Sequence, residues 1–507
     1  MKKIMVMALA LLVGLGLAAP ASATDIKIKG WFDFAFGWYS NSENFNDASS
    51  DDGSHSEDRF DALQRLRLQI DFVASENLSG TLQLEIGDIH WGNSGGDTWG
   101  GAGAGNGSGG ALGADGVNVE TRHMYIDWIV PETDLSLRMG LQPFALPFFA
   151  NGAESGQAIL DDDMAGILAT YTFNEYVAVN VAWLRPWNPF IDDEATRRAF
   201  TDHDAIDLFA LTLPLTFAEY GLEITPWGLY GSIGEVDETN AHGGGSISQG
   251  LGGAWAGGDT SLGADGDAWW AGLSVNVEYW DPFFVAMDFM YGSYTSSEAA
   301  VFDANGAWLG DWDNDRDGWA LAAKLGYRFE CFTPTLFGWY GSGLSDADDE
   351  NALDGLMPVL SPDFGFTSFG GSNNYDLFRD GVMNGNNIIG TWGIGIGLED
   401  ISLIENMTNA IRVAYFAGTN DESLARLGLF SSRDLGIAGS HLYTGKDWGL
   451  EVNLDTSYEI MEGLTLYNQI GYLHFDLDDA WNAGRTEHWD NDTDDAWEFA
   501  VGFQYAF

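Results

Sequence analysis

The side chains of this chain that could do chemistry are charged, and the basic ones are unevenly distributed. Lys27 and Lys29 share one face of a predicted strand near the N-terminus, and Arg65 and Arg67 share one face of the next strand. Arg138 faces the same way on the fifth predicted strand. Because strands that follow one another in a sheet lie side by side, these cations would form a basic patch on one wall.

A loop of opposite charge follows the fifth predicted strand. Residues 146–165 contain Glu154 and the run Asp161, Asp162 and Asp163. Arg122 lies on the fourth strand, but the sequence leaves its facing ambiguous. The alternative interpretation is that the aspartate run is a solvated outer loop and that the arginines balance neighbouring acids.

Catalytic chemistry is not indicated. A hydrolytic site would need a histidine beside a nucleophile or an acid. The eight histidines are scattered and form no recognisable constellation; they are His55, His90, His123, His203, His242, His441, His474 and His488. We therefore expect no enzyme and no cofactor.

One aspartate-rich segment, 311–318, begins like a calcium loop. With Asp313 as its first position, the twelfth is Lys324, where an EF-hand needs a bidentate glutamate. The EF-hand interpretation therefore fails. Looser calcium binding by Asp313, Asp315 and Asp317, or by the aspartates of 490–494, stays open beside a solvated loop without metal.

The elements that would position these charges are strands. From Trp497 to Phe507, bulky apolar residues alternate with small or polar ones. A period of two is what a strand between lipid and a watery lumen requires. The ending resembles the C-terminal assembly signal of outer-membrane β-barrels. The resemblance implies that Phe503, Tyr505 and Phe507 are read by the barrel-assembly machinery. A secreted soluble β protein is the alternative.

The N-terminus predicts export. Lys2 and Lys3 precede an apolar stretch, and residues 21–23 form an A-x-A cleavage site. We expect residues 1–23 to be a cleaved signal peptide and residues 24–507 to be one outer-membrane β-barrel domain. After the signal, no apolar run is long enough for a spanning helix, so any membrane crossing must be by a closed barrel.

Alternating segments of about ten residues predict an all-β, antiparallel up-and-down transmembrane barrel with long external loops. We count 18 strands, with 16 as the alternative. They lie near 25–39, 61–74, 78–91, 117–130, 135–145, 166–173, 177–187, 205–217, 222–234, 268–280, 283–296, 318–330, 334–343, 387–399, 409–419, 448–461, 464–477 and 496–507.

Composition restricts the partners. Two of the 21 Lys and Arg lie in the signal peptide, which leaves 19 against 76 Asp and Glu, a net charge of −57 for the mature chain. Such acidity excludes nucleic acid as a partner. The cleanest strands place carboxylates inside and large apolar residues outside. We therefore expect a polar, substantially anionic inner wall, with most large aromatic residues facing lipid. Eighteen strands enclose more space than side chains fill, so the interior should be an aqueous channel unless something plugs it.

This layout resembles the general bacterial trimeric porins, and among them most closely the outer-membrane homotrimeric porin family of sulfate-reducing bacteria. In the general porins the third external loop folds inward, and its acids face an arginine-rich wall. The resemblance implies that Glu154 and Asp161 to Asp163 form the acidic lip of a constriction. Lys27, Lys29, Arg65, Arg67 and Arg138 would form the basic wall. The loop lacks the Pro-Glu-Phe-Gly-Gly motif of enteric porins.

From these features we expect a passive porin of the cell outer membrane for ions and small hydrophilic solutes, with a cation preference. The expected partners are outer-membrane lipid, lipopolysaccharide and two further copies in a homotrimer. A substrate-specific channel for a sugar or another small nutrient is the main alternative. A purely structural surface protein is the third.

Overall fold

The computed structural model of the chain describes residues 24–40, 59–92, 119–150, 157–188, 205–234, 266–296, 299–302, 308–312, 315–345, 355–362, 364–367, 388–423, 442–478 and 495–507. The strands are β1 (Asp25–Ser40), β2 (Arg59–Ser75), β3 (Leu78–His90), β4 (Val119–Ile129), β5 (Leu135–Ala145), β6 (Asp161–Asn174), β7 (Val177–Trp187), β8 (Ile206–Thr212), β9 (Leu215–Phe217), β10 (Leu222–Ile233), β11 (Gly266–Val277), β12 (Phe283–Ser296), β13 (Ala299–Phe302), β14 (Trp308–Trp312), β15 (Arg316–Tyr327), β16 (Thr333–Gly341), β17 (Thr391–Ile404), β18 (Met407–Gly418), β19 (Trp448–Met461), β20 (Leu464–Asp476) and β21 (Ala496–Ala506). A 3-10 turn, η2 (Ala218–Tyr220), precedes β10. Among the described residues no helix is long and apolar enough to cross a membrane.

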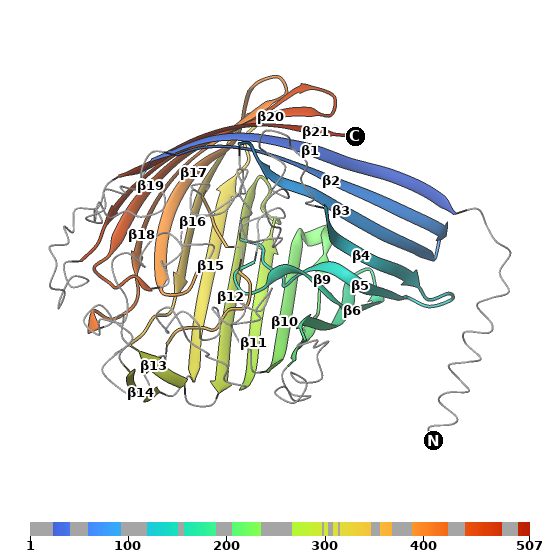
Figure 1. Ribbon diagram of the computed structural model, residues 1–507, viewed down its shortest axis with the longest axis horizontal. Helices are drawn as coiled ribbons and strands as arrows, with labels where there is room; N and C mark the ends of the chain where they lie inside the picture. Colours follow the sequence, from blue (N-terminus) through green and yellow to red (C-terminus); the bar gives the residue numbers. More distant parts are fainter. Residues whose placement is uncertain are drawn as a thin grey trace.

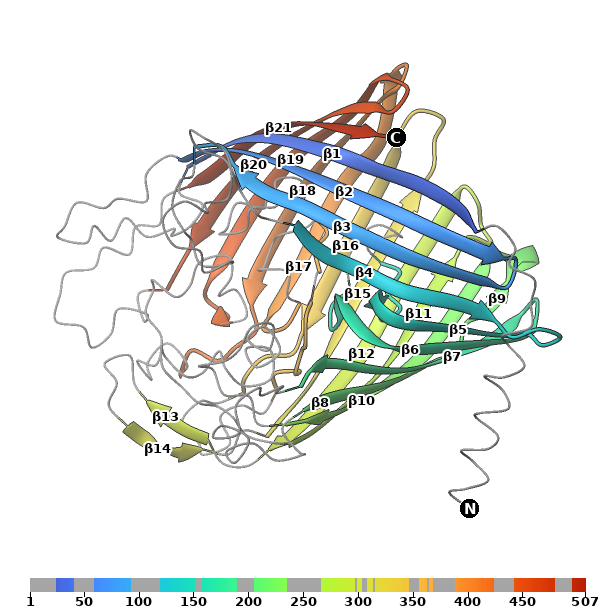
Figure 2. The same ribbon diagram turned by 45° about the vertical axis from the view of Figure 1, so that its right-hand side comes forward.

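The strands form one closed antiparallel barrel. Each strand pairs with the next along the wall, and β1 pairs with both β2 and β21, which closes the sheet. Strands β8 and β9 both pair with β10 and act as one barrel strand, interrupted at Leu213 and Pro214. The predicted 18-stranded barrel is confirmed, and the 16-stranded alternative is excluded. Figures 1 and 2 show the wall from two sides.

The two ends of the barrel differ in the length of their connections. At one end, here called the short-turn end, eight hairpin connections are short, such as 76–77, 405–406 and 462–463. The opposite end, the long-connection end, carries the remaining links. At the short-turn end β1 runs past the start of its pairing with β21 at Trp31, so its first residues project beyond the C-terminus (Figure 1).

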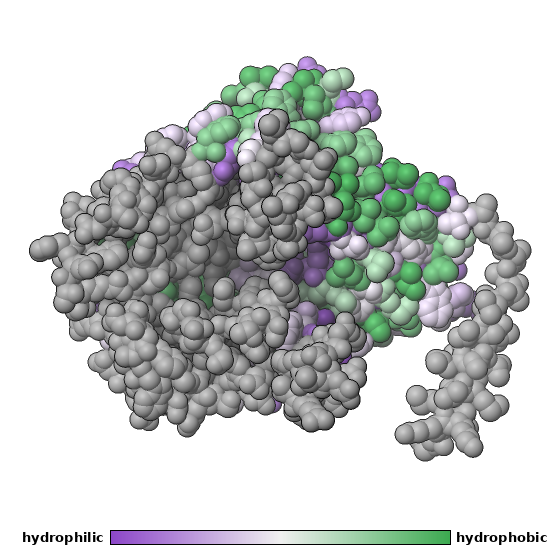
Figure 3. All heavy atoms as spheres, in the orientation of Figure 1, coloured by the Kyte–Doolittle hydropathy of each residue, from purple (hydrophilic) through white to green (hydrophobic). Residues whose placement is uncertain are grey.

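The alternation predicted for the last strand is confirmed. In β21, Trp497 and Phe499 are exposed on the outer face, whereas Ala496, Glu498 and Ala500 are buried on the inner face. The same alternation leaves large apolar side chains exposed around the wall, and hydrophobic residues predominate on the coloured part of the wall at the upper right of Figure 3. An apolar outer face over a polar or packed interior is the pattern of a strand in contact with lipid.

The strand pattern differs from the sequence prediction at one boundary near the site and by one additional hairpin. Strand β6 begins at Asp161 rather than near 166, because β5 continues to pair with it up to Ala145. The run Asp161 to Asp163 therefore belongs to a strand and not to the loop. The hairpin of β13 and β14, which pair only with each other, was not predicted.

The expectation of a polar inner wall is wrong for one side of the barrel. Inward-facing Trp227, Trp270, Phe337 and Trp339 are buried in an apolar core. The sequence contains the signal for one of them: Trp269 and Trp270 are adjacent, and successive strand residues point to opposite faces, so one of the pair must point inward.

Candidate functional site: the barrel interior

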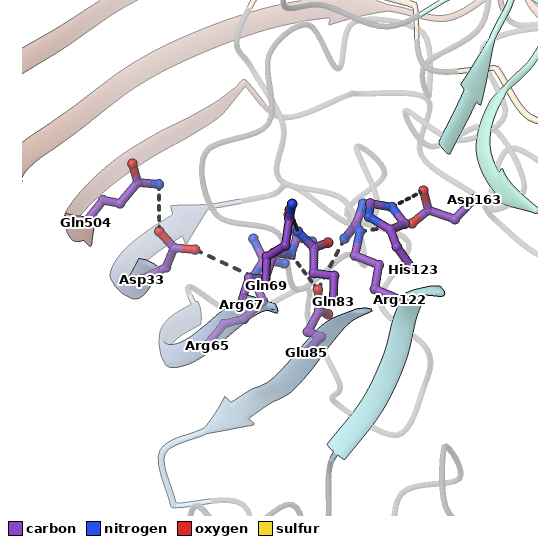
Figure 4. Close-up of polar contacts among 10 residues, drawn as sticks. All are labelled: Asp33, Arg65, Arg67, Gln69, Gln83, Glu85, Arg122, His123, Asp163 and Gln504. Atoms are coloured by element: carbon purple, nitrogen blue, oxygen red, sulfur yellow. Dashed lines mark hydrogen bonds and ion pairs between the residues drawn. The ribbon is translucent and has the colours of Figure 1, made fainter. Parts of the chain in front are cut away.

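A charged row crosses the inner wall from β21 to β6. Its members, called the charged row below, are Asp33, Arg65, Arg67, Glu85, Arg122, His123 and Asp163, with Gln504 at one end. Figure 4 shows these side chains in a line, linked by hydrogen bonds and ion pairs.

Strand register sets the first half of the charged row. Asp33 of β1 lies directly opposite Gln504 on one side and Arg65 on the other. Gln504 Nε2 donates to Asp33 Oδ1 at 2.9 Å, and Arg65 Nε lies 3.7 Å from Asp33 Oδ2. One strand further, Arg67 lies opposite Glu85, and Arg67 Nε donates to Glu85 Oε2 at 2.5 Å. Directly opposite side chains are close enough for such pairs.

A β-bulge determines the positions of the side chains in the second half of the charged row. The register of β3 and β4 shifts between Gln83 and Leu84, which leaves Arg122 as the extra residue of β4. A bulge re-aims side chains, so the adjacent Arg122 and His123 both reach the interior. Arg122 donates to Glu85 at 3.2 Å and contacts Asp163 at 2.9 Å, and His123 Nε2 lies 2.8 Å from Asp163 Oδ1.

A second charged cluster lies on β15, β17, β18 and β19. Glu399 accepts from Lys324 Nζ at 2.7 Å and from Arg412 Nε at 3.4 Å. Arg412 also donates to Asp455 at 2.6 Å. In this second cluster, as in the charged row, acidic side chains are paired with basic ones.

Cavities lie between the described residues of the interior, and two of them border the charged groups. The first, of about 740 Å³, lies between the charged row and the second cluster and is lined by Arg65, Arg67, Arg412 and Gln469 among others. The second, of about 630 Å³, lies toward the short-turn end. Its ionic lining is Asp161, Glu223, Glu278, Glu399 and Asp400 with only Lys324 and Arg328. The second cavity is therefore the more acidic of the two.

Two chain segments from the long-connection end lie inside the barrel. The first lumenal segment, between β5 and β6 (described as 146–150 and 157–160), is bonded to the opposite wall: Phe149 N–H and Ala150 N–H donate to Asp288 on β12. The second lumenal segment (355–362 and 364–367, between β16 and β17) is bonded through Pro358 O, which accepts from Trp270 Nε1 at 2.7 Å.

The two lumenal segments also bind each other. The N–H groups of Leu360 and Ser361 donate to Ile159 O at 3.0 Å, and Asp161 N–H donates to Ser361 O at 2.8 Å. Phe148 packs edge-on against Phe364, with ring centroids 5.8 Å apart. Together the segments fill the side of the interior formed by β6 to β16 with apolar side chains.

The basic residues predicted to form one wall of a constriction do not all lie together. Arg65 and Arg67 lie in the charged row. Lys27 and Lys29 lie near the short-turn end of β1, where Lys29 is 3.6 Å from Asp71. Arg138 also lies toward that end, where Arg138 Nε donates to Asp127 at 2.8 Å and the guanidinium stacks over Tyr125.

The predicted acidic residues have separate positions as well. Glu154 lies outside the described residues. Asp161 borders the second cavity, Asp162 accepts from Ser361 Oγ at 2.9 Å, and Asp163 ends the charged row. Asp163 thus contacts the basic wall directly and does not face it across a gap.

The aspartates that the sequence suggested as calcium ligands do not lie together in one loop of the described residues. Asp313 and the aspartates of 490–494 lie outside the described residues, whereas Asp317 lies in β15 and accepts from Tyr291 Oη at 2.8 Å. Within the described ranges, no group of three or more His, Cys, Asp and Glu residues could hold a metal ion.

The C-terminal residues close the barrel. Phe503 and Tyr505 lie in β21 opposite Phe34 and Phe32. Phe507 and Gly30 exchange two backbone hydrogen bonds of 3.1 and 2.9 Å. These residues therefore form the seam between the first and last strands.

Several interior residues were not predicted as site residues from the sequence: Glu85, Lys324, Glu399 and Arg412. Alternation alone could have placed them inward, but nothing local indicates which of them pair. Arg122 needed the bulge, which the sequence does not mark.

Comparisons with known proteins give a fold likeness only. No family model and no curated protein matches the chain. Similar solved structures are Pseudomonas aeruginosa OprD (11% identity, TM-score 0.49, covering 96% of this chain and 97% of that one) and OpdL of the same organism (13%, 0.48, 95% and 99%). OccK9 (OpdG) is similar at 11% identity and a TM-score of 0.49, covering 95% and 98%. Likeness at these values does not bear on what this chain transports.

Proposed function

We propose that the protein is a passive outer-membrane channel, a porin, for ions and small hydrophilic solutes. The observation that carries the proposal is a closed barrel whose interior holds charged side chains around a cavity of about 740 Å³. Charges buried inside a wall of strands are stable when paired and hydrated, which suits a water-filled path.

Location in a membrane follows from the outer face. Large apolar side chains are exposed on most barrel strands, for example Val181 at 52% and Ile396 at 62%. An exposed apolar band of this extent would aggregate in water but is stable in hydrocarbon. Export by residues 1–23 and recognition of the β21 ending by the assembly machinery belong to the same proposal.

A cation preference is proposed to come from the second cavity. The charged row pairs its acids with its bases, so it contributes little net charge. The second cavity has five carboxylates and two basic groups in its lining, and an excess of fixed negative charge concentrates cations. The preference should weaken in high salt because mobile ions screen fixed charge.

The inward course of the first lumenal segment supports a constriction formed by this part of the chain. Its described residues reach the opposite wall, and Asp163 of β6, the strand that follows it, contacts Arg122. We propose that solutes enter along the charged row, because apolar side chains fill the other side toward the long-connection end. They then continue past Glu399 and Asp400, which line both cavities, into the second cavity.

The test is planar-bilayer conductance of the refolded full chain under a KCl gradient, with the reversal potential recorded. Ohmic steps with a cation-selective reversal potential are expected, and closures in groups of three would support the trimer. A barrel that inserts but carries no current would contradict the proposal.

A substrate-specific channel is the second candidate, favoured by the internal pairing around the first cavity. A charged solute there would have to compete with existing ion pairs, whereas an uncharged polar solute would not. Block of the current by a neutral sugar at millimolar concentration would favour this candidate, and unaltered current would favour the general porin.

A further inference from the structure

The first lumenal segment is held on the far wall by one buried carboxylate. Asp288 lies on the inner face of β12 and is 1% exposed. Both its oxygens accept from Phe149 N–H, at 3.0 and 2.9 Å, and Oδ2 also accepts from Ala150 N–H at 2.7 Å. Bonds from N–H groups to an ionised acceptor are about twice as strong as neutral ones.

The charge of Asp288 has no ionic partner in the described part of the chain. No salt bridge joins it to Lys, Arg or His, and its strand neighbours in register are Ser274 and Ala322. The N–H groups of the first lumenal segment therefore provide its compensation. A buried carboxylate compensated mainly by the N–H groups of a loop ties the position of that loop to its own charge.

A second hydrogen bond holds the first lumenal segment beside its bonds to Asp288. Ser274, opposite Asp288 in register, donates from Oγ to Pro147 O at 2.9 Å. Asp288 and Ser274 thus form a two-point tether for residues 147–150 on the wall opposite β5.

The tethered residues divide the interior. Phe149 and Ala150 line the second cavity, while Phe148 packs against Phe364 in the apolar core. If residues 147–150 left the wall, the second cavity would open toward the long-connection end.

We propose that Asp288 is the positioning residue that fixes the first lumenal segment across the barrel and thereby limits the conductance of the pore. The proposal rests on the channel function proposed above. It names a carboxylate on β12 that lies outside the charged row and outside the acidic residues predicted from the sequence.

The experiment compares the full-length wild-type chain with Asp288→Ala and Asp288→Asn in planar bilayers. Asp288→Ala removes every acceptor and should raise single-channel conductance about two-fold or more, because the path widens. Asp288→Asn keeps one acceptor oxygen and should fall between Asp288→Ala and wild type. The matched control is Asp317→Ala, which removes an outward-facing carboxylate from the neighbouring strand and should leave conductance unchanged.

A second readout does not depend on current. Hydrogen–deuterium exchange of the peptide covering 146–150 should become roughly ten-fold faster in Asp288→Ala, because its amides lose their acceptor. Unchanged exchange would refute the tether. Faster exchange with unchanged conductance would refute the limit on conductance. A wild-type barrel without current would refute the channel function, while the exchange rates would still decide whether Asp288 is the tether.

If Asp288→Ala does not fold, Ser274→Ala replaces it. Loss of this neutral hydrogen bond should give the same changes at smaller amplitude. Exchange and conductance equal to wild type in Ser274→Ala would then overturn the proposal.

Discussion

The two sides of the barrel interior are built from the same alternating strands but are filled differently. On the side of β17 to β21 and β1 to β4, most inward side chains around the first cavity are charged, polar or small, whereas Phe416 and Phe475 stack toward the long-connection end. On the side of β6 to β16, inward tryptophans and phenylalanines pack against the two lumenal segments. Alternation therefore decides which residues point inward, and side-chain chemistry decides whether that space holds water or protein.

The difference has an energetic basis. Ionic groups inside the barrel must be paired or hydrated, and the charged row is paired across neighbouring strands. Inward aromatic residues gain free energy only when water is excluded from them, and a wall of strands alone cannot exclude it. The two lumenal segments supply the missing contacts.

The largest expected effect concerns the charged row. Replacing Arg65 and Arg67 with glutamate changes the fixed charge there by about four units, and the ratio of cation to anion permeability should rise roughly ten-fold. The reversal potential under a KCl gradient measures it. The matched control is Lys27→Glu with Lys29→Glu, which makes the same charge change near the short-turn end. An equal shift in both variants would contradict a special role for the charged row.

On the side of β6 to β16, the expected effect of a substitution is a loss of stability. Trp270→Ala removes a fully buried ring and its bond to Pro358 O, and the free energy of unfolding should fall by about 3–5 kcal/mol. Urea unfolding followed by tryptophan fluorescence measures it. Trp269→Ala, which replaces the outward-facing neighbour, should lower the free energy of unfolding in lipid by clearly less. Equal losses would indicate that the apolar core does not depend on Trp270.

Glu399 pairs with two basic side chains, so replacing it should change both the stability of the barrel and its ion selectivity, each by a smaller amount. Glu399→Gln leaves Lys324 and Arg412 without their shared charged partner, and the free energy of unfolding should fall by about 1–3 kcal/mol. Selectivity should move toward anions by less than the arginine variant moves it toward cations. Glu405→Gln, in a short turn, is the control. A shift toward cations would refute this account of the second cluster.

The smallest expected effect on stability concerns Asp495, at the long-connection end of the barrel. Asp495, just before β21, accepts from Tyr472 Oη and pairs with His474, and these hydrogen bonds lower the pKa of its carboxyl. A lowered pKa stabilises the fold at neutral pH, and the contribution is lost as pH falls through the lowered pKa, below the ordinary value of 3.8. Because the pair is exposed, Tyr472→Phe should cost about 0.5 kcal/mol or less at pH 7, with conductance unchanged. Thermal unfolding at pH 7 and at pH 3 measures this, and a cost that grows at pH 3 would contradict it.

Much of the barrel could be predicted because strand geometry is local. The strand count, the outward face of β21 and the inward face of Arg65 and Arg67 all follow from a period of two in the sequence. The break between β8 and β9 was absorbed in one predicted strand, since Pro214 interrupts the pairing without changing the path of the wall.

The composition of the site could not be predicted to the same degree. Lys29, Arg138 and Arg67 look alike in the sequence, yet their register places them at different heights, beside Asp71, Asp127 and Glu85. The extra residue at Arg122 depends on a bulge between two strands. A pairing across strands is a property of register, and register is set by many residues together.

By itself, the sequence determined that the chain forms alternating strands with an apolar outer face, because side chains point to opposite sides of each strand. Only the tertiary structure decided which charges meet, that Asp163 joins the charged row, and that residues 147–150 reach Asp288 on the far wall. These contacts join residues that are distant along the chain: His123 and Asp163 are 40 positions apart, and Ala150 and Asp288 are 138 positions apart. No local pattern encodes such a distance, so the closure of the barrel and the inward course of its loops had to bring the partners together.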